Sequence, residues 1–291
     1  MSKKFILNAD DFGMSEAHNR AVLEGYEGGL LKSVSLVSNG EAYDEAVSKI
    51  LPSCPDLGVG VHLNIIEGNS LCQELTELTD ANGKFNQSYG SMILKAYNTK
   101  NKAFSEQIET EFRAQIEKVQ KSGIEITHID SHVHTHAIPP IFDIAAKLAK
   151  EYGIKQIRMQ FERPYFIPDP LIFFNNKYYI NLVKIALLDT FTLINKSKLD
   201  QYELNTNDYL IGVGYTSMMT PLAVSCGISA IKEQDDLTVE TLIHPCRYEE
   251  GIIDSHFVEF QITKHAKLKK KIEEMGFEIT NYRDLLSAHG D

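Results

Sequence analysis

The sequence predicts an α/β fold, a TIM-like (β/α) barrel, on the basis of two patterns. Short apolar, β-branched runs alternate with amphipathic stretches about eight times along the 291 residues. Carboxylate and imidazole side chains follow several of these runs, and in parallel β/α barrels the site lies where the strands end. Because 43% of the residues are hydrophobic and no linker is evident, we expect one domain spanning residues 1–291.

The expected strands are short runs rich in Ile, Val, Leu, Phe and Tyr, a composition typical of buried parallel strands. They are Phe5 to Leu7, Val34 to Val37, Leu57 to Leu63, Ile124 to Ile129, Ile154 to Met159, Tyr209 to Val213, Val239 to Ile243, and Phe277 to Thr280. The candidate site residues come from many of these strand ends rather than from one crossover point. This distribution favours a closed or nearly closed barrel over an open sheet.

Helices are expected between these strands. In the segment 104–120, apolar residues recur close to the helical period, with Glu and Lys on the opposite face. A second helix, 141–152, follows Pro139-Pro140, which is a favourable helix start, and Gly153 closes it.

Two stretches depart from the alternation, and we interpret them as insertions. Residues 67–101 are polar and contain Asn82-Gly83, which indicates a loop excursion. Residues 161–208 are rich in Pro, Phe and Tyr and include an apolar, helix-like run that reaches Ile194. Long insertions at the site face of a barrel shape a substrate pocket or a subunit contact, and the sequence leaves both uses open.

The charge and cysteine content restrict the classes of function. A formal net charge of −11 provides no basic surface for nucleic acid or an anionic membrane, so we expect neither partner. The four cysteines contain no C-x-x-C pair, which argues against a zinc ribbon and a disulfide framework. The apolar run before Asp10 is too short for a signal peptide or a membrane-spanning helix, and we expect a cytoplasmic protein.

The most informative segment is Asn8-Ala-Asp-Asp-Phe-Gly13, which places Asp10 and Asp11 directly after an expected strand. Two adjacent carboxylates require a compensating positive charge. A metal ion is the usual one, with one carboxylate as ligand and the other as base. The competing interpretation is a helix N-cap, because a helix is expected to begin soon after Ser15.

Histidines occupy corresponding positions after other strands. His62 ends one apolar run, although it could equally be a histidine satisfied within the core. In a later histidine-rich stretch, residues two apart share a strand face, so Asp130, His132, His134 and His136 can converge while the strand lasts, although not all can be ligands. His132 is the best ligand candidate, and Asp130 and His134 would orient imidazoles or contact substrate. The alternative is a polar cluster in a loop.

Two further residues complete the set. His244 ends an apolar strand before Pro245 and is either a site residue or a surface histidine. Arg158 follows another expected strand segment and either orients a carboxylate or is a solvated charge.

Together these segments resemble the YdjC/ChbG-like carbohydrate deacetylases from the first strand to the last helix. The matching motifs are Asn8 to Gly13, Ser33 to Gly40, Gly60 to Asn64, Thr127 to His134, and His244-Pro245. The resemblance implies a TIM-like barrel, often a homodimer, that removes acetyl groups from N-acetylated sugars such as chitooligosaccharides and releases acetate. Cys246 stands where a small Gly or Ala is expected, and Asn69-Ser70 where Pro is common, which leaves the substrate open.

Carried over by position, the resemblance assigns three residues to one divalent metal ion: Asp11, His62 and His132. Asp10 would be the catalytic base, His244 the catalytic acid, and Arg158 would hold Asp10. Two imidazole ligands favour zinc because of their softness, whereas the family is commonly described with magnesium. The ion is therefore left open between Mg²⁺ and Zn²⁺.

The chain contains no Trp, so stacking against a sugar ring must come from Tyr or Phe. The aromatic candidates are Tyr165, Phe166, Tyr178 and Tyr215.

Two other functions compete with deacetylation. A binuclear metal phosphoesterase or amidohydrolase on the same barrel usually places His-x-His at the end of the first strand, where this chain has Asp10-Asp11. A non-catalytic sugar-binding barrel needs no base, so the presence of both aspartates argues against it.

Overall fold

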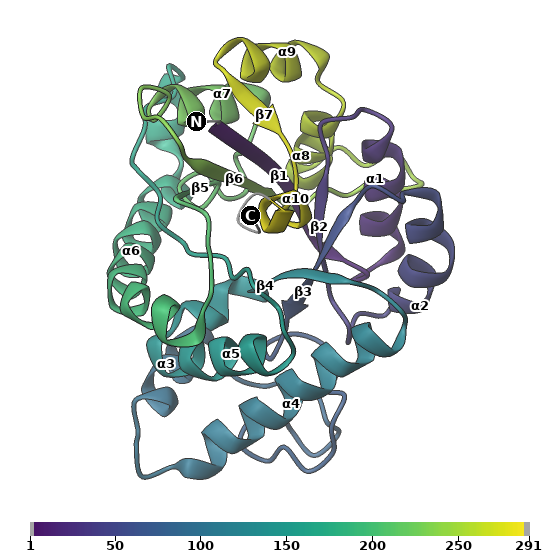
Figure 1. The fold of residues 1–291 in the computed structure, drawn as a ribbon, viewed down its shortest axis with the longest axis vertical. Coiled ribbons are helices and arrows are strands. Elements are labelled where there is room, and N and C mark those ends of the chain that lie inside the picture. The colour runs from purple at the N-terminus through teal and green to yellow at the C-terminus, as the bar shows by residue number, and fades with distance from the viewer. Residues whose placement is uncertain (1–2, 288–291) are drawn as a thin grey trace.

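The computed structural model describes residues 3–287, in which parallel strands form a ring surrounded by helices (Figure 1). The strands are β1 (Lys3–Phe12), β2 (Ser33–Leu36), β3 (Gly58–Leu63), β4 (Ile126–Ser131), β5 (Tyr209–Ile211), β6 (Thr238–Ile243) and β7 (Phe277–Ile279). The sheet order is β4-β3-β2-β1-β6-β5, β7 also pairs with β1, and these pairings are all parallel. The predicted α/β class is confirmed.

An irregular segment, residues 154–161, bridges the two edges of this sheet. In it, Ile157 pairs with Ile129 of β4, and Gln156 pairs with Asn205, a few residues before β5. The segment therefore completes an irregular TIM-like barrel between β4 and β5.

The strand expected from Ile154 to Met159 is present only as these isolated pairings. The side chain of Asn207 hydrogen-bonds both backbone groups of Met159. Its Oδ1 accepts from the N–H at 2.9 Å, and its Nδ2 donates to the carbonyl at 2.9 Å. Because a side chain replaces the neighbouring strand at this point, a continuous ladder does not form.

β7 and the helix after it, α10 (Tyr282–Ser287), lie at the amino ends of the strands. β7 pairs with Lys3 to Phe5 of β1, whereas β2 pairs with the later part of β1. The expected eighth strand therefore exists, but it shares one side of β1 with β2 instead of adding a separate member to the ring. α10 occupies the centre of the ring in Figure 1, and Arg283 donates to the carbonyl of Leu57, just before β3.

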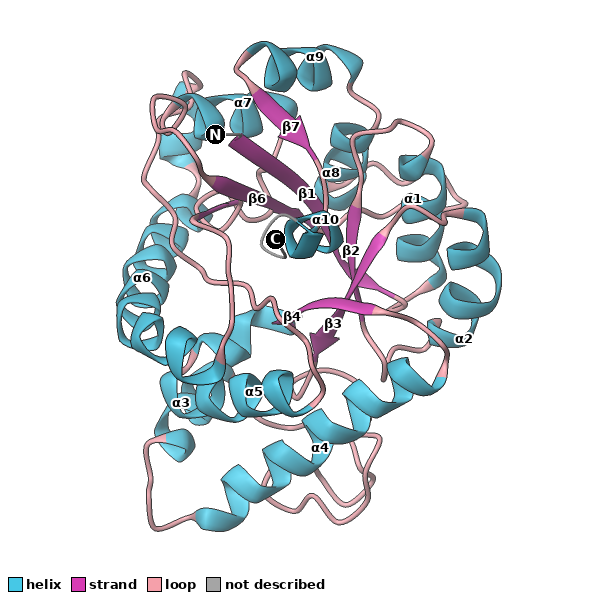
Figure 2. Ribbon diagram, in the orientation of Figure 1, coloured by secondary structure: helices cyan, strands magenta, loops and turns pink. Residues whose placement is uncertain are grey.

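The other helices lie outside the strands (Figure 2). They are α1 (Glu16–Tyr26), α2 (Tyr43–Glu45), α3 (Tyr89–Ala96), α4 (Lys102–Lys121), α5 (Pro139–Glu151), α6 (Asn176–Tyr202), α7 (Pro221–Ser229), α8 (Ser255–Thr263) and α9 (Ala266–Glu274). α4 and α5 confirm the helices expected at 104–120 and 141–152. Among residues 3–287, no helix combines the length and apolarity needed to cross a membrane.

Both insertions contain helical structure. The first, interpreted as a loop, includes α3, because Ser88 and Ser91 form a reciprocal N-terminal cap and Met92 and Ala96 are buried. The second contains α6, which continues past the predicted apolar run to a left-handed residue at Glu203.

Side chains alternate along the strands between the helix layer and the barrel interior. In β1, Phe5, Leu7 and Ala9 pack in the main hydrophobic core, whereas Asn8 and Asp10 bond to each other inside the barrel. Other strands add buried polar side chains: Ser35, His62, His128, Asp130 and Glu240. The interior is therefore polar, unlike the branched aliphatic layers that usually fill such a barrel.

Arg158, which is fully buried, is the centre of this polar interior. Its Nη1 and Nη2 donate to the two carboxylate oxygens of Asp10 at 2.8 and 2.7 Å, and Nη2 lies 2.8 Å from Oδ2 of Asp130. Its Nε donates to Glu240 at 2.9 Å, and the Tyr282 hydroxyl donates to the other oxygen of Glu240. One guanidinium thus contacts three buried carboxylates.

The pKa values of these groups follow from burial and from the guanidinium. Burial would raise the pKa of Asp10 and of Asp130, but Arg158 and His62 together outweigh it and both values are lowered. For Glu240 burial dominates over Arg158, and the pKa is raised. The stability of the polar interior therefore depends on the positive charge of Arg158.

We expect Arg158→Met to destabilise the fold by about 3–5 kcal/mol at pH 7, since it leaves three buried carboxylates without their cation. In the variant, burial raises the carboxylate pKa values above those of the unfolded chain. The folded variant then binds more protons than the unfolded one, so its stability increases as the pH falls from 7 toward 5.

Urea denaturation at both pH values, with wild type and the exposed-site control Arg163→Met, measures this effect. Wild-type stability in the Arg158 variant at pH 7, or a further loss at pH 5, would contradict the assignment.

Candidate active site and metal centre

Three side chains from different strand ends converge at the carboxyl edge of the sheet. Asp11 lies near the end of β1, His62 in β3, and His132 directly after β4. Oδ1 of Asp11 lies 2.8 Å from Nδ1 of His132 and 3.3 Å from Nε2 of His62. One donor atom from each residue lies within 4.8 Å of the others. The structure thus brings together the three residues that the sequence suggested as metal ligands.

The backbone of β1 is distorted where the two aspartates occur. Asp11 has a φ of 62°, and the pairing with β2 shifts register between Ala9 and Phe12. In a regular strand, consecutive side chains point to opposite faces, so a bulge is needed for Asp10 and Asp11 to reach one site. A non-glycine residue in this conformation costs about 1–3 kcal/mol, and such strain concentrates at functional sites.

The surroundings of the two imidazoles are strongly negative. Burial would lower the pKa of His62, but the charge of Asp130 and a hydrogen bond to Asp11 raise it to about 10. Burial also opposes a charge on His132, yet Asp11 and Glu67 raise its pKa to about 8. Positive charge is therefore stabilised at this position, which suits a cation-binding site.

A second group of possible donors comprises Asp10, His62 and Asp130. Both of its carboxylates are already bound by Arg158, at 2.7 and 2.8 Å. A cation there would lie against a guanidinium, so Asp11, His62 and His132 are the better fit. The second group instead orients His62, because Nδ1 of His62 donates to Asp130 at 2.8 Å.

His244 follows β6 and lies near these residues. Its backbone N–H donates to Oε2 of Glu259 in α8 at 2.5 Å, and its Nδ1 lies 3.4 Å from the same oxygen. Burial would lower the pKa of His244, but Glu259 raises it to about 9. The imidazole therefore carries a proton at neutral pH.

A cavity of about 330 Å³ connects these groups. Its lining combines the polar side chains of Asp10, His132, His134 and His244 with residues of α6 and the loop after β5: Lys184, Leu187, Leu188 and Val213. Burial lowers the pKa of His134, whose Nδ1 is buried without a hydrogen-bond partner. His134 is thus a neutral imidazole with unused hydrogen-bonding capacity.

The aromatic candidates for stacking do not line this cavity. The rings of Tyr165 and Tyr215 pack 4.9 Å apart, and the Tyr215 hydroxyl donates to the carbonyl of Tyr165. Tyr178 packs on Tyr215 as well. These three tyrosines pack on one another where the second insertion meets the loop after β5, and Tyr89 is the tyrosine in the cavity lining.

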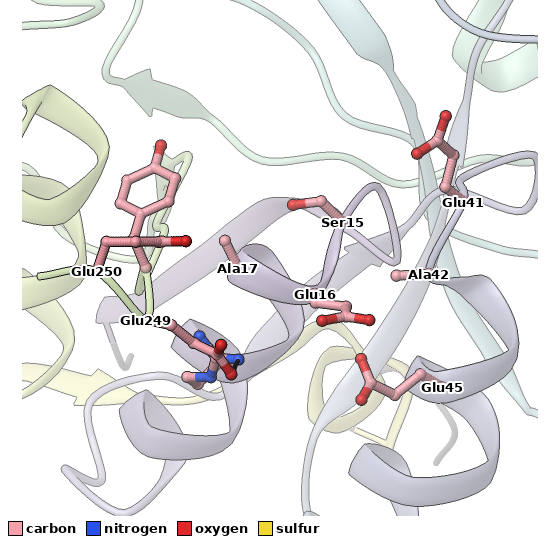
Figure 3. Close-up of a pocket in the computed structure, with 10 residues that line it drawn as sticks. Ser15, Glu16, Ala17, Glu41, Ala42, Glu45, Glu249 and Glu250 are labelled. Carbon is pink, nitrogen blue, oxygen red and sulfur yellow. Dashed lines mark hydrogen bonds and ion pairs between the residues drawn. The ribbon is translucent and has the colours of Figure 1, made fainter. Parts of the chain in front are cut away.

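A larger pocket, of about 530 Å³, opens between the loops that follow β1, β2 and β6 (Figure 3). Its lining is dominated by carboxylates: Glu16, Glu41, Glu45, Glu249 and Glu250. The candidate ligands are not part of this lining, and the chemistry is assigned to the smaller cavity.

Sequence reasoning did not select Glu67, Glu240 or Glu259. Glu240 could have been noticed, because a single charge inside the apolar run of β6 requires a buried partner. Glu67 and Glu259 lie in a loop and a helix that carry no comparable signal, and only the folded chain brings them to His132 and His244.

The comparisons with known proteins agree with this arrangement. A carbohydrate deacetylase of Clostridium beijerinckii is 31% identical over 82% of this chain and 93% of its own length. Carbohydrate deacetylase 1 of Listeria innocua is 30% identical over 97% of this chain and 100% of its own. The crystal structure of a proposed cellobiose-phosphate cleavage protein from Enterococcus faecalis, 22% identical, covers 98% of this chain and 99% of its own with a TM-score of 0.74, which shows a shared fold.

The family described as YdjC-like protein matches residues 4–274, which include all of the candidate site residues. With this match and the full-length relatives, the chain belongs to the YdjC-like family, as its motifs predicted.

Proposed function

We propose that this chain is a metal-dependent carbohydrate deacetylase that hydrolyses the N-acetyl group of a chitooligosaccharide-like sugar and releases acetate. The observation that carries the proposal is one cavity bordered by His132 of the candidate metal centre, the arginine-bound Asp10, and the protonated His244. The relatives named carbohydrate deacetylase support the reaction class, hydrolysis of a C–N bond.

Asp11, His62 and His132 would hold a single divalent ion. A carboxylate with two imidazoles is a common donor set for such an ion and leaves positions open for water and substrate. When bound, Zn²⁺ or Mg²⁺ supplies a water of lowered pKa and polarises the amide carbonyl. Since the neighbouring donor group is occupied by Arg158, a single ion fits better than the pair used by binuclear hydrolases.

Asp10 would act as the general base. Arg158 keeps its carboxylate ionised and fixes both oxygens, with Asn8 donating to Oδ1 at 2.7 Å. An ionised carboxylate at the edge of the cavity can accept the proton of the attacking water. The rigid guanidinium contact orients this base, at the expense of its basicity.

His244 would act as the general acid. It borders the same cavity as Asp10 and is protonated at neutral pH because of Glu259. The sugar nitrogen needs a proton to leave, and an imidazolium can donate it. His134, neutral and also in the cavity lining, would hydrogen-bond the sugar.

The reaction is tested by acetate release from N,N′-diacetylchitobiose and a panel of N-acetylated sugars. We expect release by wild type with Zn²⁺ or Mg²⁺, loss with a chelator, and a decrease in kcat of about 10²–10⁴-fold in Asp10→Asn. Asp44→Asn, at an exposed position, serves as the control. An absence of acetate from every sugar, with metal bound and the protein folded, would exclude this function.

If His244 is the general acid, the profile of kcat against pH has a limb on the alkaline side where activity falls. The active form carries a proton on His244, so we expect kcat to fall as the pH rises through about 9. Glu259→Gln removes the negative charge that stabilises the imidazolium, which lowers its pKa and moves this limb to lower pH. Acetate release is measured between about pH 6 and 10, a range that includes the ordinary histidine pKa and the raised pKa of His244. If the limb does not move in that variant, the proton belongs to another group.

We also propose that a second copy of the chain covers α6. Apolar side chains at helical spacing remain exposed along it, and one of them, Leu187, also borders the cavity: Ile180 (56%), Val183 (70%), Leu187 (36%) and Ile194 (48%). Such a stripe packs well against the same stripe of another helix.

Light scattering after size exclusion should give a dimer for wild type and a monomer for Val183→Glu. Leu94→Glu, at an exposed apolar site on α3, should stay dimeric. A monomeric wild type would contradict this interface.

A further inference from the structure

The imidazole of His132 is contacted at both of its nitrogens. Nδ1 lies 2.8 Å from Oδ1 of Asp11, and Nε2 lies 3.2 Å from Oε2 of Glu67. His62 is also contacted at both nitrogens, since its Nε2 faces Asp11 and its Nδ1 donates to Asp130. Each candidate imidazole ligand therefore has one nitrogen toward Asp11 and the other on a carboxylate.

Glu67 belongs to a loop after β3 whose backbone is fixed by Asn64. Oδ1 of this buried asparagine accepts from the N–H groups of Ile66 and Glu67 at 3.1 Å each, and its Nδ2 donates to the carbonyl of Glu67 at 2.8 Å. The backbone of Asn64 is held in turn by Gln115 of α4, which accepts from its N–H at 2.9 Å and donates to its carbonyl at 2.6 Å. The position of Glu67 is thus determined by buried groups.

The loop is also anchored on the far side of Glu67. Nδ2 of Asn39 donates to the carbonyl of Asn69 at 2.9 Å, and the buried carboxylate of Glu111 accepts from the N–H groups of Leu71 and Cys72 at 3.0 Å each. Anchors on both sides explain how a carboxylate that is 63% exposed can be directed at one imidazole nitrogen.

From this geometry we infer that Glu67 is a positioning residue of the metal site. Its carboxylate accepts the Nε2–H of His132, which fixes the ring and leaves Nδ1 as the nitrogen that faces Asp11. Carboxylates behind imidazole ligands set the tautomer and strengthen metal binding in this way. The inference rests on the proposed function, because it concerns the same metal site.

Glu67 is a favourable residue for a test, because it makes no contact with Arg158 or with the three carboxylates that Arg158 binds. Asp130 fills the same place behind His62 but also contacts Arg158, so its replacement would disturb the fold. Replacement of Glu67 removes one contact to His132 and leaves Arg158 and its three carboxylates unchanged.

Calorimetric titration of the metal-free protein with Zn²⁺ tests the inference. We expect Glu67→Ala to weaken zinc binding about 10- to 100-fold. Glu67→Gln should fall between Ala and wild type, since its amide oxygen can still accept from Nε2. Glu41→Ala removes an exposed carboxylate on the same face and should bind zinc like wild type. Equal affinities for wild type and Glu67→Ala would overturn the inference.

A double-mutant cycle with His132→Ala identifies the path of the effect. If Glu67 acts through His132, Glu67→Ala has no further effect on zinc affinity once the imidazole is removed. A similar loss in both backgrounds would make Glu67 a direct ligand or a general electrostatic contributor, and would overturn the positioning role.

Two outcomes distinguish an error in the role of Glu67 from an error in the proposed metal centre. If wild type binds zinc and releases acetate but Glu67→Ala does the same, only the role of Glu67 is wrong. If wild type binds neither Zn²⁺ nor Mg²⁺, both the proposed metal centre and the role of Glu67 are wrong.

Discussion

The rest of the structure depends on a single buried cation, the guanidinium of Arg158. Three carboxylates share it, Asp10, Asp130 and Glu240, and without it they would repel one another in a barrel interior that excludes water. The same contacts orient the site, because Asp10 is held directly and His62 is held through Asp130. The geometry of the candidate base and that of a candidate ligand therefore have a common origin inside the barrel.

Most of the fold was predictable because the signals are local. An apolar run followed by a charged side chain identifies a strand end without any knowledge of its neighbours, and Asp10, Asp11 and His62 were found in this way. The irregular segment 154–161 was not, because its pairing is interrupted by the side chain of Asn207, about 50 residues later. The partners Glu67 and Glu259 depend on long-range contacts of the same kind, which have no periodicity along the chain.

The second insertion contributes to one wall of the cavity and, in our proposal, to a subunit contact. α6 places Leu187 at the cavity and also within its exposed stripe, so the two uses that the sequence left open are compatible. The tyrosines proposed for stacking instead pack on one another where the insertion meets the loop after β5. Substrate specificity would therefore depend on the apolar side of α6 and on Tyr89, more than on an aromatic platform.

Charge balance explains why the carboxyl edge of this barrel suits a divalent ion. Without an ion, His62 and His132 bind protons, with pKa values of about 10 and about 8, because Asp11 and its neighbours favour positive charge there. A divalent cation brings two positive charges while the imidazoles that bind it give up two protons, so the total charge of the buried site is preserved. Exchange of protons for the ion therefore requires no change elsewhere in the network around Arg158. If the proposed metal centre is correct, acid would weaken metal binding while Asp10 and Asp130 are still ionised, since the candidate ligand imidazoles would retain their protons.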